Sequence, residues 1–120
     1  MRIAITAGGK GLSERFDSRF GRAAYFIICD TDSGAWEAHS NVQNFEAAQG
    51  AGIQAAQTIQ RLGAAALVTG HVGPKAFKVL QAGGVKVFSA KAETAAEALA
   101  AFRRGELTEL TSPDVEGHWV

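Results

Sequence analysis

Short apolar runs alternate along the chain with segments in which apolar residues recur at helical spacing. Such alternation is typical of an α/β domain, in which the runs form strands and the periodic segments form helices. We expect five strands, at residues 2–7, 24–30, 35–41, 64–69 and 85–89. We expect three helices, at residues 48–62, 74–81 and 94–103, the last opened by a capping box of Thr94 and Glu97.

The order of these elements predicts the topology of the sheet. The turn Thr31-Asp32-Ser33-Gly34 has hairpin chemistry, so the second and third strands should be antiparallel neighbours. Right-handed crossovers through the helices should bring the first, fourth and fifth strands parallel. The prediction is a three-layer α/β fold with a five-stranded mixed sheet, order 3-2-1-4-5 and strand two antiparallel. Residues 106–120 show no strong pattern and are expected to form a tail.

Composition narrows the class of protein. A chain of 120 residues closes one hydrophobic core, so we expect a single domain over residues 1–120. Twelve basic and twelve acidic side chains give a formal net charge of zero, which argues against non-specific nucleic-acid binding. The lone Cys29 excludes an internal disulfide and any multi-cysteine metal cage. No secretory signal or membrane-spanning run is visible, so a cytoplasmic protein without membrane contact is expected.

Two glycine-rich loops carry the unusual residues of the sequence. One loop, GGKGLSERFDSRFGR at 8–22, follows the first strand, and the other, GHVGPK at 70–75, follows the fourth. Both strands should end at the point where the winding of the sheet reverses, which is where open α/β sheets bind ligands. The first loop has four cations against two acids, and the second leads into a helix N-terminus, which favours anions. We therefore expect one anion-binding site between the loops.

The candidate binding residues combine close backbone approach, positive charge and an apolar wall. His71 is also the candidate metal ligand, and a hydrogen bond to the ligand or a helix-capping role are the alternatives for it. The candidates in the two loops are Gly8, Gly9, Lys10, Arg15, Arg19, Phe20, Gly21, Arg22, Gly70, His71, Gly73, Pro74 and Lys75.

Residues for catalysis are missing from the expected positions. The topology resembles that of ribonuclease H-like nucleases, which hold two metal ions with carboxylates on the central strands. Here the strands RIAITA and AAALVT contain no carboxylate, and no nucleophile elbow or Cys-His pairing occurs. Neither loop matches a nucleotide fingerprint. The sequence therefore argues against an enzyme.

Several ordered motifs resemble the dinitrogenase iron-molybdenum cofactor biosynthesis family over about residues 1–105. They are Ser18-Arg19-Phe20-Gly21-Arg22-Ala23-Ala24-Tyr25-Phe26, the segment with Asn41 and Asn44, Ala51-Gly52, and Gly70-His71-Val72-Gly73-Pro74-Lys75-Ala76. The resemblance implies a small domain that binds or carries a metal-sulfur cluster, and it adds Asn41 and Asn44 to the candidate binding residues.

For a free-standing domain of this length, the resemblance implies non-covalent binding of an anionic molybdenum-copper sulfide cluster, with another iron- or molybdenum-sulfur cluster as the alternative. A cluster already saturated by sulfide needs N–H donors, guanidinium groups and apolar walls rather than protein thiolates. On this hypothesis Arg19 and Arg22 supply charge and Phe20 forms a wall. Other proteins of cluster assembly would be partners, and Cys29 stays outside the site.

Two other functions remain open from the sequence alone. The same loops could bind a nucleotide or a phosphorylated metabolite in a regulatory domain or an enzyme. Alternatively, the sheet edge and the tail around Trp119 could form an interaction module that contacts a larger partner.

Overall fold

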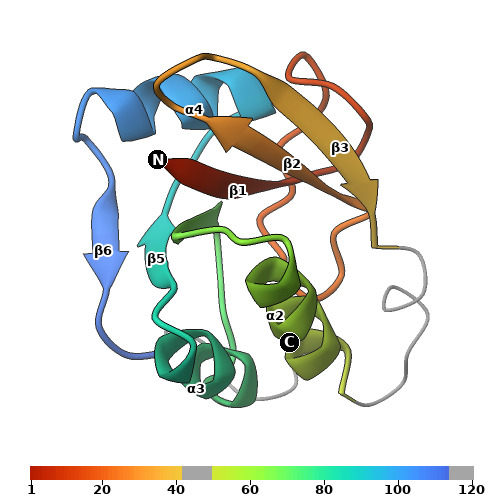
Figure 1. Ribbon diagram of the computed structural model, residues 1–120, viewed down its shortest axis with the longest axis vertical. Helices are drawn as coiled ribbons and strands as arrows, with labels where there is room; N and C mark the ends of the chain where they lie inside the picture. The colour runs from red at the N-terminus through yellow and green to blue at the C-terminus, as the bar shows by residue number, and fades with distance from the viewer. Residues whose placement is uncertain (42–49, 114–120) are drawn as a thin grey trace.

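A six-stranded mixed sheet forms the centre of the computed structural model, which describes residues 1–41 and 50–113 (Figure 1). The order is β3-β2-β1-β4-β5-β6, so the predicted order of five strands is confirmed. β1, β4 and β5 are parallel, whereas β2 is antiparallel to both of its neighbours. The strands are β1 (Arg2–Ala7), β2 (Tyr25–Asp30), β3 (Trp36–Ser40), β4 (Ala66–Thr69), β5 (Lys86–Ser89) and β6 (Thr108–Leu110).

The sixth strand was missed, because residues 106–120 were expected to form a patternless tail. β6 pairs antiparallel with β5, with Val87 opposite Leu110 and Ser89 opposite Thr108. It has only three residues, of which Leu110 alone packs against the core. A strand this short and exposed has too few alternating positions to give a periodic signal.

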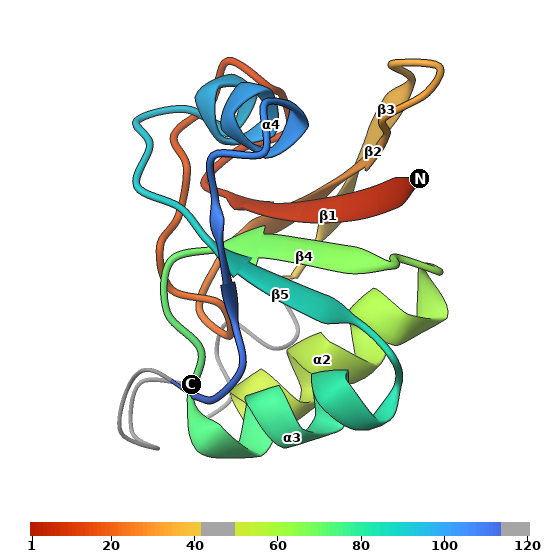
Figure 2. The same ribbon diagram turned by 90° about the vertical axis from the view of Figure 1, so that its left-hand side faces the viewer.

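Helices cover both faces of the sheet and make three layers (Figure 2). In the described residues these are α2 (Ala51–Arg61), α3 (Pro74–Ala82) and α4 (Ala95–Arg103). α2 and α3 pack together on one face and α4 lies on the other. The expected start of the first helix at residue 48 lies outside the described residues. No helix in the described part is long and apolar enough to cross a membrane.

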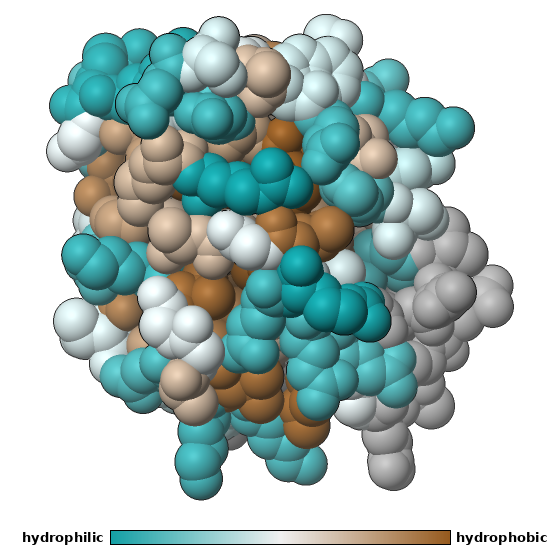
Figure 3. Space-filling model, viewed as in Figure 1, coloured by the Kyte–Doolittle hydropathy of each residue, from teal (hydrophilic) through white to brown (hydrophobic). Residues whose placement is uncertain are grey.

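Each face of the sheet has its own apolar cluster. Successive residues of β1 point to opposite faces, so Ala4 packs beneath α2 and α3 while Ile3 and Ile5 pack beneath α4. Because both faces of β1 and β4 are buried, their sequences are almost uninterrupted apolar runs. Among the described residues, Met1 and Trp36 are the exposed large hydrophobics. Figure 3 shows polar and apolar residues mixed over the face that it views.

The predicted capping residue of α4 is confirmed. Thr94 Oγ1 accepts a hydrogen bond from the Glu97 backbone N–H at 3.2 Å. The Glu97 carboxylate reaches back to the Glu93 N–H at 3.4 Å, one residue before the position expected in a capping box. Both bonds satisfy donors at this turn, and so they stabilise the start of the helix.

We predict that Thr94→Ala lowers the free energy of unfolding by about 1 kcal/mol, because the helix loses its side-chain cap. Urea denaturation followed by circular dichroism measures this change. The matched control is Thr58→Ala on α2, where the hydroxyl donates to the Gln54 carbonyl oxygen within the helix. Alanine has the higher helix propensity, so the control should change stability by less than about 0.5 kcal/mol. Equal losses in the two variants would contradict the capping role.

Candidate functional site

The two glycine-rich loops lie side by side at the carboxyl ends of β1 and β4. The His71 N–H donates to the Ser18 carbonyl oxygen at 2.7 Å, and the Phe20 N–H donates to the His71 carbonyl oxygen at 3.4 Å. These bonds make an isolated parallel bridge between Arg19 and His71. The convergence expected from the strand order is therefore present, and it involves direct main-chain bonds.

The first loop consists of two parts with different surroundings. Residues 8–15, here called the α4-side loop, close on themselves through a bond from the Gly8 N–H to the Arg15 carbonyl oxygen at 2.8 Å. The N–H groups of Ala95 and Ala96 donate to its carbonyl oxygens at residues 14 and 12. Residues 16–22, here called the crossing segment, are the part that meets the second loop. Lys10 belongs to the α4-side loop, away from these contacts.

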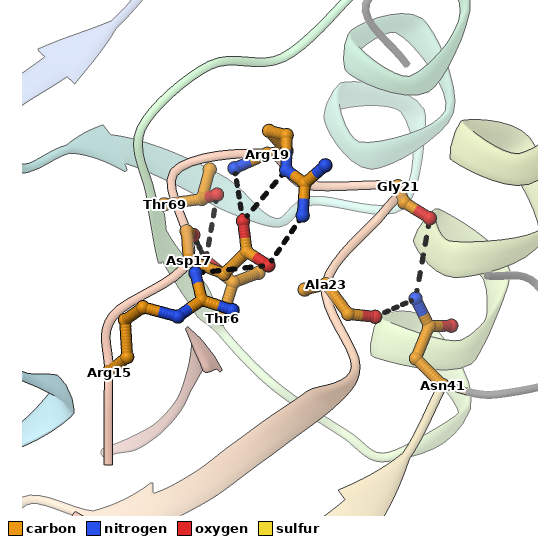
Figure 4. A network of polar contacts seen from close by, with 8 residues as sticks. All are labelled: Thr6, Arg15, Asp17, Arg19, Gly21, Ala23, Asn41 and Thr69. Atoms are coloured by element: carbon orange, nitrogen blue, oxygen red, sulfur yellow. Dashed lines mark hydrogen bonds and ion pairs between the residues drawn. The ribbon is translucent and has the colours of Figure 1, made fainter. Parts of the chain in front are cut away.

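A buried carboxylate organises the cations of the first loop (Figure 4). The side chain of Asp17 is only 3% exposed and accepts hydrogen bonds from the Arg19 N–H at 3.0 Å and from Arg19 Nε and Nη2 at 3.3 Å each. Arg15 Nη1 lies 3.8 Å from the same carboxylate. One negative charge therefore holds two guanidinium groups, which leaves a positive excess at a fixed place.

Two threonines anchor the crossing segment to the central strands. Thr6 Oγ1 donates to the Asp17 carbonyl oxygen at 2.5 Å, and the Asp17 N–H donates to the Thr6 carbonyl oxygen at 3.0 Å. The hydroxyls of Thr6 and Thr69 also bond each other at 2.9 Å, and both side chains are fully buried. Sequence reasoning missed Asp17 and both threonines as site residues. The available signal was a polar residue near the end of each apolar central strand.

The predicted glycines serve the packing of the loops. A Cβ on Gly70 would lie 2.5 Å from Ser18 Cβ and 2.7 Å from the Ser18 carbonyl oxygen. A Cβ on Gly8 would meet the Arg15 side chain at 2.7 Å, and one on Gly9 would meet the Glu14 side chain at 2.6 Å. These glycines permit close approach between parts of the chain, whereas the sequence suggested close approach to a ligand.

Phe20 and Asn41 attach the crossing segment to the body of the protein, Phe20 by packing in the core and Asn41 by hydrogen bonds. Phe20 is fully buried, with its ring centroid 5.9 Å from that of Phe26, so it belongs to the core rather than to an open pocket wall. The Asn41 side chain is buried, and its Nδ2 donates to the Ala23 carbonyl oxygen at 2.8 Å and the Gly21 carbonyl oxygen at 3.4 Å (Figure 4). Asn44 lies outside the described residues.

A hollow of about 270 Å³ opens beside the junction of the two loops. We call it the strand-end hollow, because it lies at the ends of β4 and β5. Its lining residues are Phe16, Ser18, Gly70, His71, Ser89, Ala90, Lys91 and Ala92. His71 and Lys91 are exposed, and none of the described residues that line the hollow is acidic. The segment after β5 was not predicted to take part.

The remaining predicted residues do not line this hollow. Gly73 is the N-cap of α3 and provides no side-chain cap, and Pro74 and Lys75 begin the helix with exposed side chains. Arg22 is partly exposed at the end of the crossing segment. Of the predicted binding residues, Gly70 and His71 line the hollow directly.

Within residues 1–41 and 50–113, no three His, Cys, Asp or Glu side chains are grouped so that they could hold a metal ion. Cys29 is fully buried on β2, away from both loops. Burial raises the pKa of its thiol, although the charge of Arg103 opposes that shift. This supports leaving Cys29 outside the site.

We predict that Cys29 reacts slowly with an aromatic disulfide reagent in the native protein. The thiolate is the reactive form, and both the raised pKa and the full burial of Cys29 suppress attack. Absorbance of the released thiol should rise much faster in guanidinium chloride at the same pH. Equal rates with and without denaturant would show that Cys29 is accessible in the folded state.

We predict that Gly70→Ala destabilises the protein by about 2 kcal/mol, because the new methyl group overlaps the backbone of Ser18. The matched control is Gly11→Ala in the α4-side loop, where the nearest atom to a new Cβ is on the Trp36 ring at 3.8 Å. Chemical denaturation compares the two variants. If both have the stability of the parent protein, the tight contact between the loops is wrong.

Comparison with known proteins places the chain among small proteins of similar length. The profile of the family described as dinitrogenase iron-molybdenum cofactor matches residues 1–105. The apo form of the orange protein from Desulfovibrio gigas is 43% identical with a TM-score of 0.92, covering 95% of this chain and 96% of that one.

Two further proteins are similar over most of their length. The solution structure of a putative NifB protein from Thermotoga is 42% identical with a TM-score of 0.84, covering 97% of this chain and 98% of that one. An uncharacterised protein from Methanocaldococcus jannaschii is 28% identical over 109 residues, which is 89% of each chain.

Proposed function

The chain belongs to the dinitrogenase iron-molybdenum cofactor family, and on that premise we propose that it binds and carries an anionic metal-sulfide cluster without covalent attachment. The proposed cargo is of the molybdenum-copper sulfide type, held where loops 8–22 and 70–75 meet. The family membership supports a metal-sulfur cluster in general. The choice of molybdenum and copper is the finer part of the proposal.

The strand-end hollow is the observation that supports this function most. The ionisable groups of its described lining are His71 and Lys91, without an acidic side chain. Arg19 is bridged to His71 beside it, and Asp17 holds the Arg19 guanidinium in place. A fixed positive excess at a surface hollow attracts an anion without a cage of protein ligands.

The donor set fits a cluster whose metals are saturated by sulfide. Such a cluster needs hydrogen-bond donors, cations and apolar surface, and the hollow offers His71, Lys91 and the ring of Phe16. His71 is the side chain that could also coordinate a metal at the edge of the cluster. The buried thiol of Cys29 takes no part in this arrangement.

We propose carriage rather than catalysis. Thr6 and Thr69 lie near the carboxyl ends of the central strands β1 and β4. Their hydroxyls bond each other, and the Thr6 hydroxyl also bonds the crossing segment. They act as structural anchors in the place where a metal-dependent nuclease of similar topology would have carboxylates. A carrier also requires a donor and an acceptor of its cargo, so other proteins of cluster assembly are the proposed partners.

A phosphorylated ligand is the second candidate. α3 begins at Pro74, within the second glycine-rich loop, and its N-cap Gly73 provides no side-chain cap. Helix N-termini that follow a glycine-rich loop bind phosphate groups in many α/β proteins. Saturable calorimetric binding of a nucleotide or sugar phosphate, lost in Arg22→Ala, would favour this alternative over a cluster.

We predict that purified protein mixed with tetrathiomolybdate and a copper salt retains a strongly coloured species after desalting. His71→Ala should weaken retention about tenfold, because one hydrogen-bonding side chain at the hollow is lost. The matched control is His39→Ala on the edge strand β3, which should behave like the parent protein. Visible absorption and elemental analysis of the desalted fraction measure the bound metals. A colourless protein fraction would contradict cluster binding.

A further inference from the structure

The strand-end hollow has an apolar floor and a cationic rim. Phe16 and Ala90 are almost fully buried and belong to the apolar cluster beneath α4, and Ala92 packs against the same cluster. The exposed side chains of His71 and Lys91 stand at the rim. A ligand in the hollow would therefore touch hydrocarbon on one side and positive charge on the other.

Hydrogen bonds already engage part of the backbone that lines the hollow. The N–H groups of Phe16, His71 and Ala90 donate to the carbonyl oxygens of Glu93, Ser18 and Thr69 at 2.9, 2.7 and 2.9 Å. The Ser89 hydroxyl donates to the Gly70 carbonyl oxygen at 3.1 Å. These bonds fix the hollow and engage three of its backbone N–H groups and one of its hydroxyls.

We propose that the strand-end hollow selects sulfide-terminated anions over oxygen-terminated anions of the same charge and shape, with Lys91 as the cation that contacts them. The inference rests on the proposed function, since it places the cargo in this hollow and states which chemistry of cargo fits. It also adds the end of β5 and the segment after it, residues 89–92, as a third wall beside the two glycine-rich loops.

The selection follows from the cost of removing water. Oxyanions such as phosphate and sulfate are strongly hydrated, and removing water from them against an apolar floor is costly. Sulfur is larger, more polarisable and less strongly hydrated than oxygen, so a sulfide-terminated anion loses less hydration. It also gains dispersion contacts with Phe16, Ala90 and Ala92. The rim charge attracts both kinds of anion, and so the floor provides the discrimination.

Tetrathiomolybdate and molybdate are the matched probes, because both are tetrahedral dianions of one metal and differ in sulfur against oxygen. Calorimetry on the full chain should show tetrathiomolybdate bound at least about tenfold more tightly than molybdate. Lys91→Ala should weaken tetrathiomolybdate binding about tenfold. Lys86→Ala is the control, since Lys86 is exposed at the start of β5, and Lys91 follows the end of that strand. Ala92→Ser should narrow the preference for sulfur several-fold by adding a hydroxyl to the floor.

Circular dichroism and denaturation midpoints first establish that each variant is folded. Equal affinity of the parent protein for the two anions would overturn the selection, and equal affinities of the Lys91→Ala and Lys86→Ala variants would overturn the assignment of Lys91. If either result occurs while the copper-containing colour is still retained on desalting, the proposed function stands and this inference fails. Loss of that colour in the parent protein is the separate result that counts against cluster binding itself.

Discussion

The parallel pairing of β1 with β4 determines where the two glycine-rich loops lie. Because Ile3, Ala4 and Ile5 pair with Ala66, Leu67 and Val68 in parallel, both strands deliver their following loops to the same edge of the sheet. β2 is antiparallel to β1, so the first loop connects the end of β1 to the start of β2 at this same edge. Two segments more than 40 residues apart in sequence thus become neighbours, and hydrogen bonds between Ser18, Phe20 and His71 join them.

The charge pattern at this edge depends on one buried acid. Without Asp17, no carboxylate would lie between the guanidinium groups of Arg15 and Arg19 to offset their mutual repulsion. With it, Arg19 is held by its main-chain N–H and by two guanidinium nitrogens at once. Neutral overall charge and local positive excess are therefore compatible, because an acid at the centre of the loop positions the cations around it.

Most of the fold could be predicted from the sequence, because the elements that build it have strong local signals. The hairpin turn at Thr31-Asp32-Ser33-Gly34 and the buried runs of β1 and β4 were sufficient to give the order of five strands. β6 was missed since three mostly exposed residues follow no periodic pattern. The meeting of the two loops was predictable from topology, but the details of the site were not.

Those details depend on three-dimensional contacts that sequence spacing does not encode. Gly70 looked like a ligand-approach glycine, and only the fold shows that Ser18 occupies the space beside it. Phe20 looked like a pocket wall, and its ring lies in the core against Phe26. Lys91 lies in no recognisable sequence motif. Its place at the hollow follows from the parallel pairing of β5 with β4, which sequence spacing alone does not reveal.

The anchoring of the crossing segment has a consequence for the exchange of the proposed cargo. Hydrogen bonds hold this segment in the protein without a ligand. They join the segment to Thr6, to His71 and to the Glu93 carbonyl oxygen. Binding then requires little ordering of the chain, so affinity is not reduced by a large entropic cost. The same preorganisation means that release does not depend on a loop opening. On the proposed function, an acceptor protein would remove the cargo by competing for it at the exposed rim, and transfer would be a ligand exchange between two surfaces.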